Sequence, residues 1–294
     1  MIFSSTVPTG TRKNTALLDY LSGRFTYHGR DKWEGLAAQG RITVNGLAAR
    51  ACETVAPGDM IAYDPGEFEE PAADLSYRIV FEDEWLLGID KPGNLLVHRA
   101  GRSFRNNLMY QLRYVHAPPY PAAHAAHRLD RGTSGVVCVA KNVEVLTALG
   151  RQFAEGKVDK TYLAVVRGAP EARELNFPVG KISEPAPSCR HGVVQGGKAA
   201  RTLITGVQRL GHQHSLVTVR PLTGRTHQIR VHLAAIGAPI VGDRLYGEGG
   251  EQFSRHALHC ASLSFVHPVT GHECRIEAET PGDMNELIAS LSKQ

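Results

Sequence analysis

The sequence predicts an α+β protein in two parts, a small N-terminal module and a larger domain. Helical and strand-forming segments both occur throughout the 294 residues without strict alternation, which favours α+β over a doubly wound parallel sheet. The acidic stretch 64–74, with five acids and no base, has the composition of a linker. We therefore expect a module over residues 1–64, a linker over 65–74 and a large domain over 75–294.

The N-terminal module is expected to contain two short helices and a hairpin. Apolar residues recur at helical spacing over residues 17–25 and again over 33–37. The strand-forming segment 41–44 then runs into Asn45-Gly46, the strongest short-range hairpin signal. Two helices followed by a hairpin resemble the alpha-L motif, the RNA-binding module first known from ribosomal protein S-four. Such a module binds RNA, here through Arg41, or serves only as a structural attachment.

The larger domain mixes both kinds of element. The patterns predict strands at residues 77–81, 85–89, 136–140, 161–166, 203–205 and 216–219. They predict helices at residues 104–115, 143–153, 224–236 and 283–291.

Composition indicates a soluble protein that binds a polyanion. The formal net charge is +4, and without the five acids of residues 64–74 it would be 33 bases against 24 acids, or +9. The five cysteines are scattered and form no CxxC pair, which argues against a disulfide framework and for a reducing cytoplasm. There is no signal-peptide pattern and no run of about 18 apolar residues. We therefore expect a cytoplasmic protein without a membrane span.

One carboxylate, that of Asp130, lies in a strongly basic stretch. Within residues 91–143 it is the only acid, among eight lysines and arginines. Because nearby cations favour the charged form of a carboxyl group, we expect it to be ionised. Two glycines allow a tight turn before the apolar segment 136–140. Asp130 is thus either part of a structural ion pair, with Arg128 or Arg131, or a reactive group in a cationic cleft.

Two further segments carry candidate side chains. At the start of the predicted helix 224–236, His227 and Arg230 lie three residues apart on one face, and Arg225 lies at the helix entry. Free N–H groups there favour anions, so this end binds phosphate, holds the partner of a catalytic carboxylate, or is simply a basic solvated surface. Tyr162, on a predicted strand, belongs to the core or stacks on a base.

Taken together, these clusters resemble the RluA-type pseudouridine synthases, which isomerise uridine in structured RNA. The family's active-site signature is similar to residues 127–135. Other family motifs match, in the right order, residues 89–93 with 97–98, 160–162, 224–230 and 242–247. The resemblance covers roughly residues 75–280. It implies a mixed, largely antiparallel sheet flanked by helices and loops, and it makes the N-terminal alpha-L module a familiar attachment.

The resemblance also implies roles for individual residues. Asp130 corresponds to the catalytic aspartate, and Arg225 to the arginine paired with it. Tyr162 corresponds to the tyrosine that stacks on the target uracil and has been proposed to help remove its carbon-5 proton. Arg128 corresponds to the arginine that can fill the space left by the flipped nucleotide. The remaining expected contacts with the base or the RNA are His127, Thr133, Ile229, Leu233, Arg230, Lys91 and Arg41.

The implied reaction breaks the glycosidic bond of uridine, turns the uracil and rejoins it through carbon 5. Nothing is oxidised and no group is lost, so no cofactor and no metal are expected. Asp130 must be ionised, whether it attacks the sugar or the base or takes a proton from the sugar. The uridine must first be extruded, at a cost of a few kcal/mol. The expected partner is structured RNA, ribosomal or transfer, bound by a monomer.

Two alternatives stay open at this point. A metal could bind among the histidines and cysteines of residues 256–274, although their spacing provides no second paired ligand set. The chain could instead be a non-catalytic RNA-binding adaptor. The joint presence of Asp130, Tyr162 and Arg225 argues against the adaptor.

Overall fold

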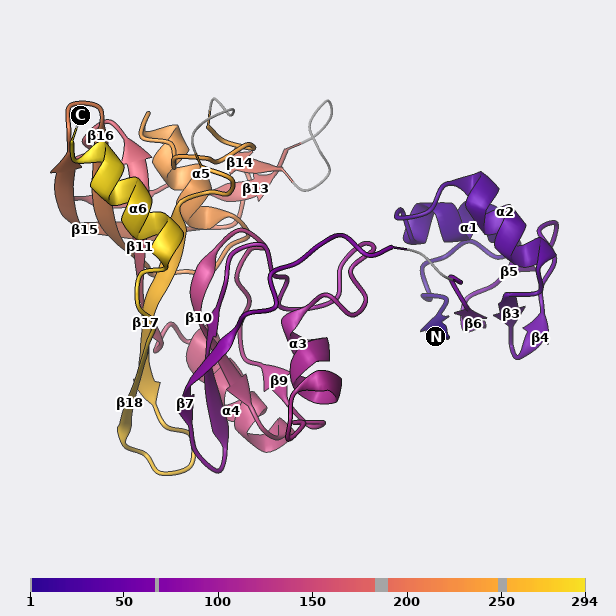
Figure 1. The fold of residues 1–294 in the computed structure, drawn as a ribbon. Helices are drawn as coiled ribbons and strands as arrows, with labels where there is room; N and C mark the ends of the chain where they lie inside the picture. The colour runs from indigo at the N-terminus through magenta and orange to yellow at the C-terminus, as the bar shows by residue number, and fades with distance from the viewer. Residues whose placement is uncertain (1, 67–68, 183–189, 248–252, 294) are drawn as a thin grey trace. The chain divides into compact units, whose positions relative to one another are not determined.

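The computed structural model describes residues 2–66, 69–182, 190–247 and 253–293. The chain divides into two compact units, one of residues 1–71 and 100–104 and the other of residues 72–99 and 105–294 (Figure 1). The first unit ends inside the stretch expected to be a linker, of which residues 67 and 68 lie outside the described residues. The division into module, linker and catalytic domain stays a prediction.

The first unit combines two helices with a small antiparallel sheet. The sheet has the order β1-β6-β3-β4, with β1 Phe3–Thr6, β6 Met60–Tyr63, β3 Ile42–Val44 and β4 Leu47–Ala48, and β2 Thr15–Ala16 pairs separately with β5 Thr54–Val55. The helices are α1 Leu17–Arg24 and α2 Arg30–Ala38. Asn45 and Gly46 both have positive φ, as a tight hairpin turn requires. The two helices and hairpin expected here are present, and the alpha-L assignment stays a prediction.

The core of this unit is aromatic. Trp33 and Ile42 are fully buried, and the ring of Phe3 stacks on Phe104 at 4.2 Å between centroids. Phe104 belongs to the short segment 100–104, which the larger unit's sequence contributes to the smaller unit. The sequence did not indicate this exchange, since residues 104–115 were expected to form one helix.

A ten-stranded mixed sheet is the scaffold of the second unit. Its order is β12-β15-β16-β11-β17-β10-β8-β7, with β18 on β17 and β9 on β10, and only β10 and β17 run parallel. The strands are β7 Arg78–Glu82, β8 Leu86–Lys91, β9 His124–Ala125, β10 Ser134–Ala140, β11 Asp159–Arg167, β12 Glu174–Asn176, β15 Arg201–Leu210, β16 His214–Pro221, β17 Leu258–Val266 and β18 Glu273–Glu277. A separate ribbon joins β13 Val179–Lys181 to β14 His191–Val193. The expected mixed, largely antiparallel sheet is confirmed.

The helices of the second unit are α3 Leu108–Tyr110, which continues as the π-helix η1 Gln111–Val115, then α4 Val143–Ala154, α5 Gln228–Ala235 and α6 Gly282–Leu291. Two of them begin later than predicted. The first begins at Leu108 because Asn107 caps it, its Oδ1 accepting the Tyr110 N–H at 3.0 Å. The helix predicted from residue 224 begins at Gln228, because His227 has a left-handed backbone with φ 57°.

Strand β10 fixes the loop that precedes it. All seven of its residues are buried, between β8 on one side and β17 on the other. Gly135 has φ 105°, and a β-carbon there would overlap the carbonyl group of Cys260 on β17. Only glycine allows so close an approach. The loop that carries Asp130 is therefore anchored at its downstream end.

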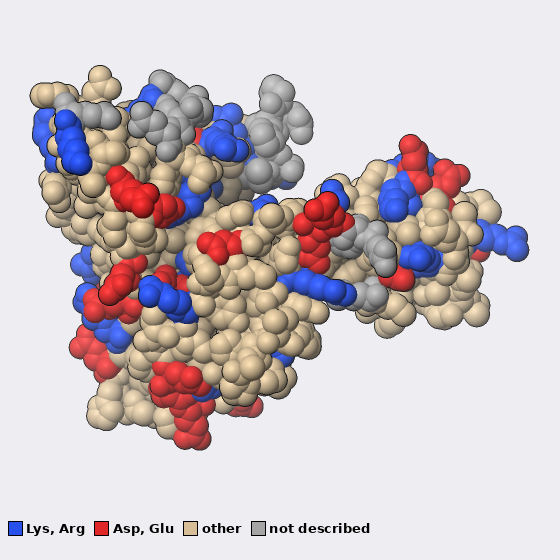
Figure 2. Space-filling view, viewed as in Figure 1, with Lys and Arg blue, Asp and Glu red and all other residues tan. Residues whose placement is uncertain are grey.

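The surface of each unit carries both signs of charge. On the face shown in Figure 2, lysines and arginines are interspersed with aspartates and glutamates rather than gathered in one patch. Among the described residues, no helix is long and apolar enough to cross a membrane.

Candidate active site

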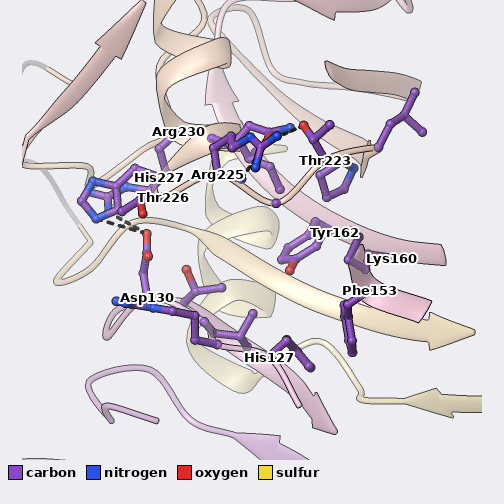
Figure 3. Close-up of a pocket in the computed structure, with 18 of the residues that line it drawn as sticks. His127, Asp130, Phe153, Lys160, Tyr162, Thr223, Arg225, Thr226, His227 and Arg230 are labelled. Carbon is purple, nitrogen blue, oxygen red and sulfur yellow. Dashed lines mark hydrogen bonds and ion pairs between the residues drawn. The ribbon is translucent and has the colours of Figure 1, made fainter. Parts of the chain in front are cut away.

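A pocket of about 490 Å³ opens in the second unit where the loop before β10, strand β11 and the start of α5 meet (Figure 3). Nine of the residues singled out in the sequence line it: His127, Arg128, Asp130, Thr133, Tyr162, Arg225, His227, Ile229 and Arg230. They come from three segments that are far apart in the chain.

Strand β17 brings two of these segments together. Gly135, at the start of β10, lies beside Cys260 of β17, and Cys260 in turn lies opposite Tyr162 of β11. The Asp130 loop and Tyr162 therefore flank one strand that comes more than 120 residues after Asp130 in the chain. Periodicity in the sequence cannot reveal this arrangement, since it requires the parallel pairing of β10 with β17.

Asp130 forms its ion pair with Arg230. The Arg230 Nη1 donates to Asp130 Oδ2 at 2.8 Å (Figure 3). The Asp130 side chain keeps 19% of its surface exposed, so the carboxylate is held firmly yet open to the pocket. Neither Arg128 nor Arg131 is its partner, which removes the structural ion pairs that the sequence left open.

The predicted pairing of Asp130 with Arg225 is wrong. Arg225 precedes α5 in an exposed loop, and its Nε donates to the Ala199 carbonyl oxygen at 3.0 Å. Its backbone N–H is held by Gln228 Oε1 at 2.9 Å. Arg230 reaches Asp130 because it lies within the helix, in a buried turn, whereas Arg225 lies before the left-handed residue at which the helix begins.

Arg230 is itself oriented by a second carboxylate. Its Nε and Nη2 donate to the two oxygens of Asp243 at 2.7 and 2.9 Å. Asp243 is buried and also accepts the backbone N–H groups of Leu245 and Tyr246. Such a two-point contact through Nε and Nη2 fixes the plane of the guanidinium group and leaves Nη1 free to point elsewhere. Asp243 thereby aims the remaining arm of Arg230 at Asp130.

The surroundings keep Asp130 ionised. Burial raises the pKa of a carboxyl group, but His227 and Arg230, together with the hydrogen bond from Arg230, outweigh burial, so the pKa of Asp130 lies below its usual value. The Nε2 atom of His227 is 3.7 Å from Asp130 Oδ2. The group is therefore a carboxylate at neutral pH, as a nucleophile or a base must be.

Tyr162 lies in the aromatic part of the pocket, away from Asp130 in the view of Figure 3, together with Phe153 and Lys160. Its side chain is 8% exposed, and burial raises the pKa of its phenol well above the ordinary value. The pocket thus contains a neutral aromatic ring, suited to stacking, in addition to the ionised group. Tyr162 thus belongs to the core and also lines the pocket, and its stacking on a base stays a prediction.

His127 supports the loop from the same side. Its Nε2 accepts the backbone N–H of Cys138 at 3.0 Å, and its ring lies 5.1 Å from that of Phe153. Burial lowers the pKa of His127 to about 3, so the ring is neutral. Thr133 has a similar supporting contact, with its Oγ1 2.8 Å from Nε2 of His256.

Two of the expected RNA contacts, Lys91 and Leu233, are buried in the core and do not line the pocket, and a third, Arg41, lies in the other unit. Lys91 is completely buried, and its Nζ donates to the carbonyl oxygens of Pro92 and Leu95, because β8 ends beneath the Asp130 loop. Leu233 is also fully buried and packs in the core, about one turn of α5 beyond Ile229, and it does not line the pocket. Arg41, the residue just before β3, is exposed on the surface of the other unit.

Two side chains of the site, Asp243 and Tyr246, received no role from the sequence, and His227 was noted only as part of the basic end of the predicted helix. The segment 242–247 did match a family motif, but its distance from Arg230 in the chain gave no sign that the two meet. Three of the histidines considered for a metal bind protein groups: His256 contacts Thr133, His259 contacts Ser134, and His267 Nε2 lies 3.0 Å from Asp83 Oδ2. Within the described ranges, no group of three or more potential ligands could hold a metal ion.

Comparisons with known proteins agree with one another. A profile of the RNA pseudouridylate synthase family matches residues 86–235. A ribosomal large subunit pseudouridine synthase D from Pseudomonas aeruginosa is 34% identical over 297 positions, covering 93% of this chain and 91% of that protein. An uncharacterized RNA pseudouridine synthase from Bacillus subtilis is 34% identical, with 86% of each chain covered. The structure of human RNA pseudouridylate synthase domain containing 1 matches with a TM-score of 0.58 at 28% identity, covering 77% of this chain and 98% of that one.

Proposed function

Because the chain belongs to the RNA pseudouridylate synthase family and is an RNA pseudouridine synthase, we propose that its substrate is a uridine in the RNA of the large ribosomal subunit. The support is the name of its relatives, which are ribosomal large subunit pseudouridine synthases in several bacteria. Transfer RNA is the competing substrate. We further propose that the protein acts as a monomer in the cytoplasm.

The observation that carries the mechanism is the ion pair of Asp130 with the buried Arg230 at the wall of the pocket. We propose Asp130 as the catalytic group, with Arg230 in the role that the family resemblance implied for Arg225. Arg230 holds the carboxylate ionised and oriented without closing it off from a ligand. Attack on the sugar or base and removal of a sugar proton both require this state.

The remaining parts of the pocket have matching roles in this proposal. The target uridine enters the 490 Å³ pocket only after it leaves its stack in the RNA, which costs a few kcal/mol. Tyr162 offers a ring on which the uracil stacks. Arg128 is exposed at the rim, in a position to occupy the space that the nucleotide leaves. Ile229, which is buried and lines the pocket, packs near the base.

We propose that the N-terminal unit adds an RNA contact of its own, in which Arg41 takes part. Its two helices and hairpin have the order of the alpha-L motif. Arg41 is exposed, and its Nη1 lies 3.7 Å from Asp64 Oδ2, a surface contact that gives up little when the guanidinium turns to a phosphate. Replacing Arg41 with alanine should weaken RNA binding and leave the rate on bound RNA unchanged.

The test is to map pseudouridine in all RNA from cells that contain the protein, lack it, or contain only the Asp130→Asn variant. We expect one or more sites in the large-subunit ribosomal RNA to be lost both without the protein and with the variant. Asp159→Asn, which changes an exposed aspartate outside the pocket, is the matched control and should restore the sites. Loss of sites only in transfer RNA would refute the proposed substrate, and full modification by Asp130→Asn would refute the role of Asp130.

A further inference from the structure

His227 occupies a strained position at the start of α5. Its φ of 57° and ψ of 16° lie in the left-handed region, which costs an L residue with a β-carbon about 1 kcal/mol or more. It stands at the N-cap, but its side chain makes no capping hydrogen bond. The ring is therefore free for other contacts, and the strained backbone turns it into the pocket beside Asp130 (Figure 3).

The Nδ1 atom of His227 is bound by Tyr246, whose hydroxyl oxygen lies 2.8 Å away. The same hydroxyl oxygen accepts the backbone N–H of His191 at 2.9 Å. A backbone N–H can only donate, so the Tyr246 oxygen is already an acceptor on that side. The natural acceptor for the Tyr246 proton is then Nδ1 of His227, which must be unprotonated to receive it.

The other ring nitrogen gives the same assignment independently. The Nε2 atom of His227 lies 3.7 Å from Oδ2 of Asp130. If Nε2 were unprotonated, its lone pair would face a carboxylate oxygen, and the two would repel each other. With a proton on Nε2, an N–H group points toward the carboxylate and stabilises its charge. Both sides of the ring therefore favour the neutral form with its proton on Nε2.

Tyr246 also contacts the second partner of Asp130. The guanidinium carbon of Arg230 lies 5.0 Å from the centre of the Tyr246 ring, a cation–π contact. The Tyr246 backbone N–H donates to Asp243, the carboxylate that orients Arg230. One residue thus touches both groups that face Asp130, with its hydroxyl toward His227 and its ring toward Arg230.

We propose that Tyr246 is a positioning residue of this enzyme, which sets His227 in the Nε2–H form and thereby presents a second N–H group, beside that of Arg230, to Asp130. This inference rests on the proposed role of Asp130. It assigns no bond-making step to His227 or Tyr246. Their effect is on the orientation and charge of the carboxylate.

Burial keeps His227 neutral despite the two carboxylates near it. Burial lowers the pKa of His227 most; the carboxylates of Asp130 and Asp243 raise it, while Arg230 and His191 lower it, and the net pKa lies below the ordinary value. The phenol of Tyr246 stays protonated, since burial raises its pKa. At neutral pH the pair is thus a phenol that donates to an imidazole, with no net charge added beside Asp130.

The test compares Tyr246→Phe with the wild type of the full chain. Phenylalanine keeps the ring under Arg230 and removes only the hydroxyl group. We expect kcat on an RNA transcript to fall about tenfold, as loss of one hydrogen bond of about 1.4 kcal/mol would give, with KM changed less than twofold. Nitrogen-15 NMR of the histidine rings should show His227 protonated on Nε2 alone in the wild type, and a mixture of the two forms in the variant.

Tyr77→Phe is the matched control, because it removes a hydroxyl that lies 3.1 Å from Nδ1 of His116, outside the pocket. Its kcat should equal that of the wild type. His227→Asn, which tolerates the left-handed backbone, should lower kcat at least as much as Tyr246→Phe. A wild-type His227 protonated on Nδ1, or a kcat of Tyr246→Phe within twofold of the wild type, would overturn the inference. If the wild type modifies no RNA, the proposed function fails, and the NMR result still decides which form His227 takes.

Discussion

The two ends of the pocket are built on opposite principles. At the polar end, Asp130, Arg230 and Asp243 form a chain of charge-assisted hydrogen bonds of 2.7 to 2.9 Å. At the aromatic end, Tyr162 and Phe153 offer rings, and the nearby His127 is neutral. The polar end fixes the direction of a charge, whereas the aromatic end offers a surface that any planar base can cover.

This difference predicts how each end tolerates change. A hydrogen-bonded chain fails as a unit when one member is removed, because the remaining charges stay buried without partners. A stacking surface loses contact area in proportion to what is removed. Substitutions at the polar end should therefore damage both stability and activity, and those at the aromatic end should mainly damage activity.

The largest expected effect is on stability at the polar end. Arg230→Gln should lower the free energy of unfolding by about 3–5 kcal/mol, because it leaves the fully buried Asp243 carboxylate without its cation. Arg225→Gln is the matched control on an exposed arginine of the same pocket and should change it by less than about 0.5 kcal/mol. Urea denaturation followed by circular dichroism measures both. An equal fall in the free energy of unfolding in the two variants would show that the ion pairs of Arg230 do not stabilise the fold.

A smaller effect is expected at the aromatic end. Tyr162→Leu should lower kcat/KM by about 5- to 150-fold, the equivalent of about 1–3 kcal/mol for one stacked base. The measurement is pseudouridine formation on an RNA transcript, with Tyr114→Leu, an exposed tyrosine outside the pocket, as control. If the Tyr162 variant keeps full kcat/KM, the aromatic end is not a stacking surface.

His256, which contacts Thr133 next to the Asp130 loop, should make the free energy of unfolding depend on pH. Burial lowers the pKa of His256 to about 3. The unfolded chain binds a proton there below about pH 6.5 and the folded chain does not, so stability falls as the pH falls. Between pH 6 and pH 5 the free energy of unfolding should fall by about 1 kcal/mol for this reason. His256→Gln should remove that part of the slope, and an unchanged slope would assign it to other groups.

The smallest effect is expected at the exposed rim. Arg128→Ala should lower kcat/KM about two- to fivefold, since an exposed contact between a cation and a ring is worth about 0.5–1 kcal/mol. If Arg128 fills the space of the flipped nucleotide, the salt dependence of RNA binding should stay that of the wild type. If the variant instead lowers the slope of the logarithm of the binding constant against the logarithm of the salt concentration by about 1, Arg128 contacts a phosphate. Arg209→Ala, on the exposed end of β15, controls for the loss of one charge.

The sequence alone was enough for the fold class, for the helices and for six of the twelve described strands of the second unit, but β17, which links the Asp130 loop to Tyr162, was not predicted. It also singled out Asp130, whose catalytic role stays a proposal. The apolar run 136–140 is rich in valine, which favours a buried strand over a helix. Asp130 drew notice as the lone acid of a basic stretch, and the family resemblance, not its charge alone, favoured a reactive role. Helix starts were less predictable. The start of α5 depends on the left-handed backbone of His227, which is set by tertiary contacts rather than by local preference.

What only the tertiary structure decided was the identity of Asp130's partners. The sequence has Arg225 and Arg230 five residues apart in one basic cluster, and the family resemblance pointed to Arg225, whereas the structure pairs Asp130 with Arg230. The choice depends on which guanidinium is buried with Asp243, and on the pairing of β10 with β17, which sets the Asp130 loop beside α5. The amino-acid sequence shows which residue types are present and at what spacing. The direction in which a side chain points at a turn is settled by its neighbours in space, because they supply the hydrogen bonds that hold it.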